Sequence, residues 1–482
     1  ILSSLVGSEM CIRDRTYAKG RYAKAISVLS DRSPSLFVEP SWNRYLQIEP
    51  FSADPLNESY QWWNFDVVNI PEALDIIGQE VKPVNVAVLD TGSPYAVDPA
   101  FSRSIFDTEW GWDMVDNDAL ADDDEFPNGS FSHGTHVGST ISMLNDGIDG
   151  NGMAARVTPI RVCGGSGCPG SATYGAYLYL NGDDNDSLTT FAQRSAGQKL
   201  HSVNMSYGGS GGSATSSACV KLGELAEKGV LIASSSGNSG IGSVGWPSSC
   251  PRVYSVGATN GTDRRSSYSS TNEYVAFSAP GGEYSDWNAD GIDDLVYAYA
   301  RDDSYVQTSN NGNPLIGAQG TSMASPHGAG FLGLIKYYYE DIVKPFESNT
   351  TLPSSLTYVE VDKMLAANLL TNDVNKEERP NDSVARPGWD EHLGYGIIDL
   401  QKAIKAIDSF QNGYFTSFDA LPYYEGPSTI TLNPEESYTG QFTLTPKGAA
   451  GEGFNEVTYT YVTEFLNIES DGLTFTVTKQ ED

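Results

Sequence analysis

The hydrophobic positions between residues 84 and 410 alternate between short apolar runs and longer stretches with helical spacing. The short runs predict buried strands, and the longer stretches predict helices that pack against them. Because strands that alternate with helices usually form parallel sheets, the pattern predicts an α/β fold with a central, mostly parallel sheet. The predicted strands are 84–89, 157–162, 202–205, 230–233 and 253–256, and the predicted helices are 133–144, 218–228, 323–339, 361–370 and 400–407.

The pattern changes after residue 413. Segments 441–445, 457–462 and 473–477 alternate apolar residues with Thr or Tyr, the period of two that is typical of half-exposed strands. Residues 413–482 are therefore predicted to form a small β-rich C-terminal module, shorter than the roughly 100 residues of an immunoglobulin-type sandwich. No run of about 18 apolar residues occurs, so no membrane-spanning helix is expected.

The charge of the chain restricts its partners. Asp and Glu total 62 against 29 Lys and Arg, which gives a net charge of −33. A polyanion of this kind repels nucleic acids and anionic membranes, so neither is expected as a partner. An acidic surface keeps a chain soluble and suits a secreted protein.

The N-terminal segment and the cysteines bear on processing and location. Residues 5–15 are similar to a translated sequencing adapter, so residues 1–15 are expected to be an artefact, and an export signal is expected to be missing from this chain. Four cysteines remain, and they form either two local disulfides or four buried thiols; bridges would imply an oxidising compartment. The two pairs are Cys163 with Cys168 and Cys219 with Cys250.

Four polar residues stand where predicted strands and helices begin or end, as catalytic groups of α/β proteins do. Each alone is equally typical of a turn or a helix cap. However, the order Asp, His, Ser is the chain order of the subtilisin type of catalytic triad. The four are Asp90 after the first strand, His133 at a helix start, Asn238 on a turn after a strand, and Ser322 at the start of the long buried helix.

The segments around three of these residues resemble the signature blocks of the subtilisin-like serine proteases, the subtilases. They read Val-Leu-Asp-Thr-Gly at Asp90, His-Gly-Thr-His-Val-Gly at His133, and Gly-Thr-Ser-Met-Ala-Ser-Pro-His at Ser322. The resemblance extends over residues 55–407. It implies a catalytic domain at 55–410 with the three-layer subtilisin-like fold.

The resemblance also implies an activity, that of a serine endopeptidase working through an acyl-enzyme. Ser322 would attack the scissile carbonyl, His133 would take its proton, and Asp90 would hold the imidazole. Asn238 stands where the family has the side chain that binds the oxyanion together with the serine N–H. His136, one turn after His133, is expected to support the helix and not to bind zinc, because the spacing of a zinc-protease helix is missing.

Further parts of the chain resemble the family as well. Ser206, Tyr207 and Gly208 lie in a segment similar to the substrate-binding strand, which would pair with extended protein or peptide substrates. Tyr207 and Gly328 depart from the leucine and valine that are usual in the family. Residues 16–50 look like the remnant of an inhibitory propeptide, so the protein is expected to be a secreted zymogen, inhibited by its own propeptide and monomeric.

A second site is indicated by acidic and amide residues at alternate positions around a glycine turn. Their spacing resembles the calcium loops of integrin-type propeller blades and predicts structural Ca²⁺, although a solvated acidic turn is the alternative. The proposed ligands are Asp286, Asn288, Asp290, the Ile292 carbonyl and Asp294. A second acidic group is interpreted as a further ion site or as a solvated face. It comprises Asp116, Asp118, Asp122, Asp123 and Asp124.

Two other functions remain open from the sequence. A subtilase scaffold without catalysis could serve as a calcium-dependent binding or adhesion protein, but none of the four chemical positions has been lost. A peptide ligase or macrocyclase would use the same triad and the same acyl-enzyme, so only its products would distinguish it from a protease.

Overall fold

The computed structural model describes most of the region expected to be catalytic and parts of the C-terminal module. The described residues are 62–78, 83–93, 106–123, 132–143, 152–153, 155–164, 167–183, 199–209, 213–289, 291–300, 307–308, 314–344, 352–372, 388–411, 417–418, 421–425, 437–441, 443–446, 466–470 and 474–479. The expected artefact at 1–15, the expected propeptide remnant at 16–50 and the predicted strand at 457–462 lie outside these residues.

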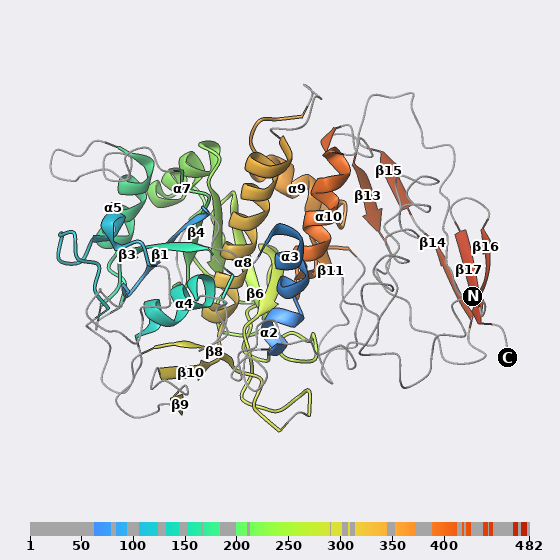
Figure 1. Ribbon diagram of the computed structural model, residues 1–482, viewed down its shortest axis with the longest axis horizontal. Helices are drawn as coiled ribbons and strands as arrows, with labels where there is room; N and C mark the ends of the chain where they lie inside the picture. Colours follow the sequence, from blue (N-terminus) through green and yellow to red (C-terminus); the bar gives the residue numbers. More distant parts are fainter. Residues whose placement is uncertain are drawn as a thin grey trace.

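A nine-stranded sheet organises the molecule, with strand order β11-β12-β7-β6-β5-β4-β1-β3-β2 (Figure 1). Every neighbouring pair is parallel except β11 and β12, so the predicted mostly parallel sheet is confirmed. Strand β1 lies between β4 and β3, so the order in which strands are added to the sheet reverses at β1. In open α/β sheets, ligands bind at the carboxyl ends of the strands at such a point. The strands are β1 (Asn85–Asp90), β2 (Trp112–Asp113), β3 (Arg156–Arg161), β4 (Ser202–Met205), β5 (Leu231–Ser235), β6 (Val253–Thr259), β7 (Val275–Pro280), β11 (Thr371–Asn372) and β12 (Ile397–Ile398).

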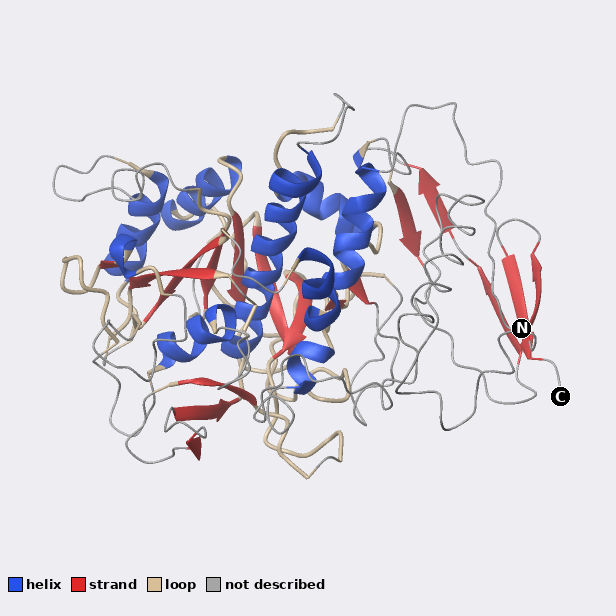
Figure 2. Cartoon of the chain, in the orientation of Figure 1, coloured by secondary structure: helices blue, strands red, loops and turns tan. Residues whose placement is uncertain are grey.

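Helices cover both faces of this sheet because successive strand residues point to opposite sides (Figure 2). In β1, Val86 and Val88 join one hydrophobic core, while Ala87 and Leu89 join a second. The first core includes side chains of α3, α4, α8, α9 and α10, and the second includes side chains of α5 and α7. The helices are α2 (Trp62–Asp66), α3 (Ile70–Ile77), η5 (Thr108–Trp110), α4 (His133–Ser142), α5 (Gly170–Asn181), α7 (Ser217–Glu227), α8 (Thr321–Tyr337), the π-helix η6 (Tyr338–Val343), α9 (Tyr358–Ala366) and α10 (Leu400–Gln411).

Three smaller sheets complete the described structure. One is antiparallel, has the order β8-β10-β9 and lies against α4. The other two belong to the C-terminal region, where β13 pairs with β15 and β17 pairs with both β14 and β16. The strands are β8 (Val296–Tyr299), β9 (Gln307–Thr308), β10 (Pro314–Ala318), β13 (Pro422–Glu425), β14 (Ser437–Gln441), β15 (Thr443–Pro446), β16 (Leu466–Ser470) and β17 (Thr474–Lys479).

Two disulfides link segments around the second core. Cys163 is bonded to Cys168 across a short glycine-rich loop after β3, and Cys219 of α7 is bonded to Cys250. Of the two readings that the sequence left open, the bridged one is confirmed.

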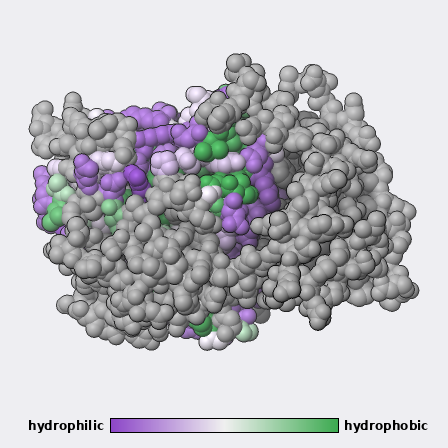
Figure 3. Space-filling model, viewed as in Figure 1, coloured by the Kyte–Doolittle hydropathy of each residue, from purple (hydrophilic) through white to green (hydrophobic). Residues whose placement is uncertain are grey.

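The described surface is mixed in polarity. On the face shown in Figure 3, hydrophilic and hydrophobic residues are interspersed. None of the described helices has the length and apolar character needed to cross a membrane.

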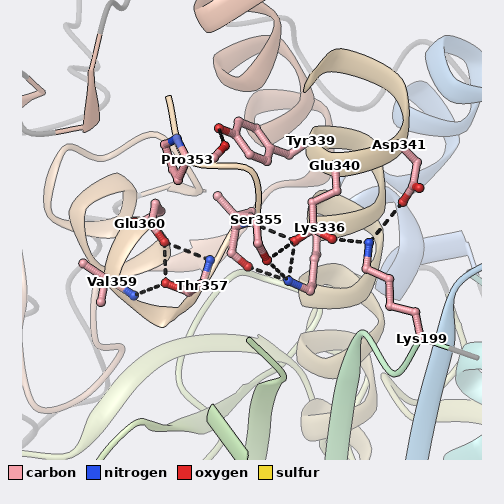
Figure 4. A network of polar contacts seen from close by, with 11 residues as sticks. Lys199, Lys336, Tyr339, Glu340, Asp341, Pro353, Ser355, Thr357, Val359 and Glu360 are labelled. Carbon is pink, nitrogen blue, oxygen red and sulfur yellow. Dashed lines mark hydrogen bonds and ion pairs between the residues drawn. The ribbon is translucent and has the colours of Figure 1, made fainter. Parts of the chain in front are cut away.

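A buried ion pair marks the C-terminal end of α8 (Figure 4). Lys336 and Glu340 are bonded to each other, and their side chains are only 3 % and 5 % exposed. Lys336 Nζ also donates to Ser355 Oγ at 2.9 Å and to the Leu356 carbonyl at 2.8 Å. Lys199, on the loop before β4, pairs with the other oxygen of Glu340. The pair therefore joins the π-helical turn of η6 to the segment that leads into α9.

Candidate active site

The candidate residues gather where parallel strands end. Asp90 is the last residue of β1, Ser206 directly follows β4, and Asn238 lies on the turn after β5. Since β1, β4 and β5 are neighbours and parallel, their carboxyl ends lie at one edge of the sheet.

His133 is the first residue of α4, and its ring is bonded to Asp90. The distance from His133 Nδ1 to Asp90 Oδ1 is 2.7 Å, and the Asp90 side chain is buried while 30 % of the His133 side chain remains exposed. Burial lowers the pKa of His133, but the negative charge and hydrogen bond of Asp90, with a further contribution from Asp123, raise it more, so that the pKa lies above its usual value of 6.5. The bonded Nδ1 leaves Nε2 as the atom that can exchange a proton with a substrate.

The first turn of α4 is held by groups from other segments. Its preceding residue, Ser132, makes no side-chain cap. Instead the Gly134 N–H donates to Thr91 Oγ1 at 2.8 Å, and the Thr135 N–H donates to Asp123 Oδ2 at 3.0 Å. These bonds satisfy two of the unpaired N–H groups at the helix start.

A glycine is required at residue 134 in this turn. A Cβ atom there would lie 2.4 Å from the carbonyl oxygen of Gly92. The close approach brings His133 next to the end of β1 and explains the Gly after the His in the sequence motif.

Ser322 is the second residue of α8 and exchanges hydrogen bonds with Ser206. Ser322 Oγ donates to the Ser206 carbonyl at 3.0 Å, and Ser206 Oγ donates to the Ser322 carbonyl at 2.8 Å. Within the described structure, the Ser322 hydroxyl therefore bonds to Ser206 and not to His133. Catalytic hydrogen bonds are often long or misaligned without substrate, so this geometry is compatible with a nucleophile.

Pro326 explains why Ser206 can reach the Ser322 carbonyl. A proline has no N–H to donate to the carbonyl four residues before it, which here is Ser322. The Ser206 hydroxyl donates to that carbonyl instead. The predicted helix at 323–339 begins earlier in the structure, at Thr321, and Pro326 lies inside it.

Asn238 is oriented by Thr321, the first residue of α8. Its Oδ1 accepts from the Thr321 N–H at 2.9 Å and from Thr321 Oγ1 at 2.8 Å. With the oxygen occupied in this way, Nδ2 is left as the donor on the other side of the amide. Gly320 precedes the helix with φ 156°, and a Cβ there would lie 3.4 Å from Asn238 Nδ2. The arrangement leaves an amide N–H next to the N–H groups at the start of α8.

The proposed substrate strand has backbone groups to offer. Gly209 is paired with Trp246 through two backbone hydrogen bonds of 2.9 Å. In the part of the chain that the structure describes, the backbone groups of Tyr207 and Gly208 have no such partner. The hydroxyl of Tyr207 contacts that of Tyr177, at 2.9 Å.

The two departures from the family pattern have different surroundings. Tyr207 contacts the buried Tyr177 of α5, which gives its hydroxyl a partner. At Gly328, a Cβ would lie 3.0 Å from Phe277 Cε2 and 3.1 Å from Val256 Cγ2. The aromatic ring of β7 thus occupies the space that a valine would need.

Three other histidines are buried and uncharged near neutral pH. His136 hydrogen bonds the Ile316 carbonyl at 2.9 Å, and burial lowers its pKa to about 3. The expected structural role of His136 agrees with this contact. Burial likewise lowers the pKa of His327 to about 4 and that of His201 to about 3.

Four of the five proposed calcium ligands lie in the described structure, and Asp290 lies outside it. Asp286 Oδ2 accepts from the Gly291 N–H at 2.9 Å, so the carboxylate folds back over the glycine turn. Asp294 is buried, and its Oδ2 accepts from the N–H groups of Gly261 and Trp287. Across the described ranges, no three His, Cys, Asp or Glu side chains are grouped to hold a metal. Calcium binding therefore stays a prediction.

The other acidic group is divided among separate contacts. Arg161 of β3 bonds Asp113 at 2.6 Å and Asp116 at 2.9 Å, while Asp118 accepts from the Leu120 N–H. Asp123 is buried against α4, and Asp124 lies outside the described residues. The interpretation of this acidic group as a solvated face fits the exposed Asp118 but not the buried Asp123.

Several residues of the site were missed by the sequence reading. Thr321 and Thr91 lie inside the recognised motifs, directly beside Ser322 and Asp90, where a hydroxyl could have been expected to serve a helix start. Asn204 lies within the predicted strand 202–205 and was assigned no role there, yet its Nδ2 donates to Ser206 Oγ at 3.0 Å and its Oδ1 accepts from Ser325 Oγ at 2.6 Å.

Comparison with known proteins gives consistent matches to one family. The sequence profile of the Subtilase family matches residues 82–396. Among curated relatives, alkaline elastase YaB of Bacillus sp. (strain YaB) is 32 % identical over 206 residues, which are 42 % of this chain and 44 % of that protein. Subtilisin Savinase of Lederbergia lenta is 30 % identical over 278 residues, 57 % of this chain and 83 % of that protein. The chain thus spans less than half the length of the first of these relatives.

Solved structures share the fold. A structure described as that of proteases from Pseudoalteromonas arctica superposes with a TM-score of 0.55 at 24 % identity, covering 74 % of this chain and all of that one. At this identity the likeness concerns the fold alone.

Proposed function

This chain belongs to the subtilase family, and from that premise we propose that it is a serine endopeptidase that hydrolyses peptide bonds in proteins through an acyl-enzyme on Ser322. The observation that carries the proposal is the 2.7 Å bond between His133 Nδ1 and Asp90 Oδ1, at the same sheet edge as a serine on a helix N-terminus.

The proposed reaction begins with proton transfer. Ser322 Oγ attacks the scissile carbonyl carbon while its proton passes to Nε2 of His133, and Asp90 stabilises the imidazolium that forms. His133 then gives the proton to the leaving amine, which departs and leaves the acyl group on Ser322. Water, deprotonated by the same imidazole, attacks the ester and restores the serine.

The oxyanion of each tetrahedral intermediate needs donors that are already in place. Asn238 Nδ2 and the Ser322 N–H are proposed to supply them, and Thr321 holds the amide in the required orientation. The start of α8 adds the positive potential of a helix N-terminus.

The substrate is proposed to bind as an added strand. The backbone groups of Tyr207 and Gly208, which lack a backbone partner within the described part of the chain, can pair with an extended peptide. This mode depends more on the backbone of the substrate than on its side chains. The segment from Ser206 to Gly208 would then align the scissile bond with Ser322.

The wider setting is also proposed. The two disulfides support secretion, since such bonds persist in oxidising compartments. We retain residues 16–50 as a propeptide remnant, 55–410 as the catalytic domain and 413–482 as a separate β-rich module, with the protein a monomer. Structural Ca²⁺ is proposed for the loop from Asp286 to Asp294, because its carboxylate and amide oxygens suit a hard cation.

Labelling with a fluorophosphonate probe tests the proposed nucleophile. An activated serine displaces the fluoride and gains the phosphonyl group, so intact-mass analysis should show one adduct, and peptide mapping should place it on Ser322. Ser322→Ala should take no label. Ser325→Ala is the matched control, because Ser325 lies one turn further in α8 and donates to Asn204 instead.

The two outcomes separate the candidate functions. Labelling that persists in a folded Ser322→Ala variant would contradict the assignment of the nucleophile. A folded parent protein that takes no label and cleaves no casein would favour a binding protein on a subtilase scaffold. Product analysis with an added amine nucleophile distinguishes hydrolysis from ligation.

A further inference from the structure

A second buried carboxylate lies behind the Asp90–His133 pair. Asp123 is 1 % exposed and accepts two hydrogen bonds on Oδ2, from the Thr135 N–H at 3.0 Å and from Thr135 Oγ1 at 2.8 Å. Both partners are donors, which favours the ionised carboxylate, although burial raises the pKa of Asp123 above its usual value. The sequence offered Asp123 only as one member of an acidic group, with an ion site or solvent as its expected surroundings.

The position of Asp123 is fixed by backbone pairing with the end of β1. The Asp123 N–H donates to the Ser93 carbonyl at 2.9 Å, and the Ser93 N–H donates to the Ala121 carbonyl at 3.0 Å. Asp123 is therefore held by hydrogen bonds to the segment that directly follows Asp90. It binds the third residue of α4, whose first residue is His133.

We propose that Asp123 is a positioning residue for His133: its carboxylate anchors the first turn of α4 to the segment after β1 and places a second negative charge beside the imidazole. The inference deepens the proposed function and rests on His133 acting as the general base. Asp90 hydrogen bonds the imidazole ring directly. Asp123 acts through its hydrogen bonds to Thr135 of α4 and through its electrostatic effect on the ring.

The charged and titratable groups around His133 are few. Asp90 faces it from β1, and Asp123 faces it from the segment before α4; both raise the pKa of the imidazole. His136, on the same helix, is neutral because burial lowers its pKa to about 3. Tyr207, which interacts with Asp90 from the exit of β4, has a pKa well above its usual value because of burial and stays uncharged. Asp123 is thus the one candidate besides Asp90, among the described groups that act on His133, for supplying negative charge.

The test compares Asp123→Asn with the parent by NMR titration of ¹⁵N-labelled histidine. Asparagine keeps an oxygen for the Thr135 donors and removes the charge. We expect the pKa of His133 to fall, because the imidazolium loses a nearby negative charge. Asp118→Asn is the matched control, since Asp118 is exposed on the same segment and should leave the titration unchanged.

Kinetics provide a second readout. In Asp123→Asn, the acid limb of kcat/KM should move to lower pH by the same amount as the NMR titration. Thr135→Val removes one donor to the carboxylate but keeps the carboxyl group itself, so kcat should fall about 10-fold with KM unchanged. This second variant keeps the inference testable if Asp123→Asn does not fold.

The outcomes are distinguishable from those of the proposed function. A parent protein without activity or fluorophosphonate label would overturn the proposed function, and the NMR titration would still report on Asp123. If His133 titrates alike in the parent and in a folded Asp123→Asn variant, the electrostatic part of the inference is wrong. If kcat is unchanged in folded Thr135→Val, the anchoring part is wrong.

Discussion

In the side chain of Asn238, one atom makes structural hydrogen bonds and another is the proposed oxyanion donor. Its Oδ1 is occupied by the N–H and the hydroxyl of Thr321, so the amide cannot turn over without losing two hydrogen bonds. The proposed oxyanion donor is therefore oriented by the fold before substrate arrives. The neighbouring threonine determines which end of the asparagine amide is left to act as that donor.

Replacing Asn238 by leucine should lower kcat about 100- to 1,000-fold with little change in KM, because the lost donor acts on the transition state. Steady-state kinetics on a peptide substrate would measure this. Thr321→Ser serves as the control, since it keeps the hydroxyl that orients the amide. If kcat/KM falls by the same factor because KM rises while kcat is unchanged, Asn238 contributes to substrate binding in the ground state instead.

At the scale of elements, Lys336 and Glu340 stabilise the junction between α8 and the segment before α9 by satisfying each other in a buried position. Burial raises the pKa of Glu340, but Lys336 and Lys199 lower it more, so the pKa lies below its usual value of 4.5. A carboxyl group of this kind stabilises the fold above its unfolded pKa, and the stabilisation is lost as the pH falls through the folded pKa.

Glu340→Gln should lower the free energy of unfolding by about 3 kcal/mol near pH 7, because it leaves Lys336 charged and buried without its partner. The double variant Lys336→Met/Glu340→Gln should recover most of this loss. Urea unfolding at several pH values measures both, and the difference between parent and Glu340→Gln should shrink below pH 4.5. A double variant no more stable than Glu340→Gln would mean that packing, and not charge, is responsible.

Some elements were predictable from their aliphatic side chains, whereas others gave no such signal. The strand predicted at 84–89 was located from its valine, alanine and leucine side chains, because a strand buried on both faces needs such side chains, and the observed β1 spans Asn85–Asp90. Helix α5 was missed, since Tyr177, Tyr179 and small residues fill its buried positions and leave no aliphatic stripe. The helix predicted at 361–370 begins earlier, at Tyr358.

The boundaries of α9 carry signals that the periodicity alone did not use. Thr357 and Glu360 form a capping box, which fixes the start of the helix at Tyr358. The helix ends at Ala366, and Asn368 with φ 53° turns the chain toward β11. In the candidate active site, motifs indicated the proposed reacting groups, but the partners of Ser206, Asn204 and Asp123 depend on contacts between separate segments and could not be predicted from spacing.

For the whole molecule, the net charge of −33 makes bound cations a factor in stability. A ligand that binds only the folded state stabilises it by mass action, by about 2.7 kcal/mol at 100 times its Kd. Calcium bound at the loop from Asp286 to Asp294 would act in this way. This loop is far in sequence from Asp90 and His133.

Removing calcium with EDTA should therefore lower the midpoint of thermal unfolding, and added Ca²⁺ should restore it. In Asp286→Ala this calcium-dependent shift should be lost, whereas Asp293→Ala, which changes an exposed neighbour outside the proposed ligands, should retain it. Differential scanning calorimetry measures the shift. A parent protein that unfolds at the same temperature in EDTA and in calcium would contradict the site.

Arg161 offers a contrast to such an ion. It reaches Asp113 and Asp116 from the end of β3, and so it provides the positive charge in a dense acidic stretch at the edge of the sheet. A guanidinium keeps its proton throughout the accessible pH range and is covalently part of the chain. The carboxylates at that edge are therefore balanced by a covalently attached cation, which chelators, dilution and competing ions cannot remove. Among the positive charges that balance the acidic residues, only bound ions depend on the ionic composition of the solution.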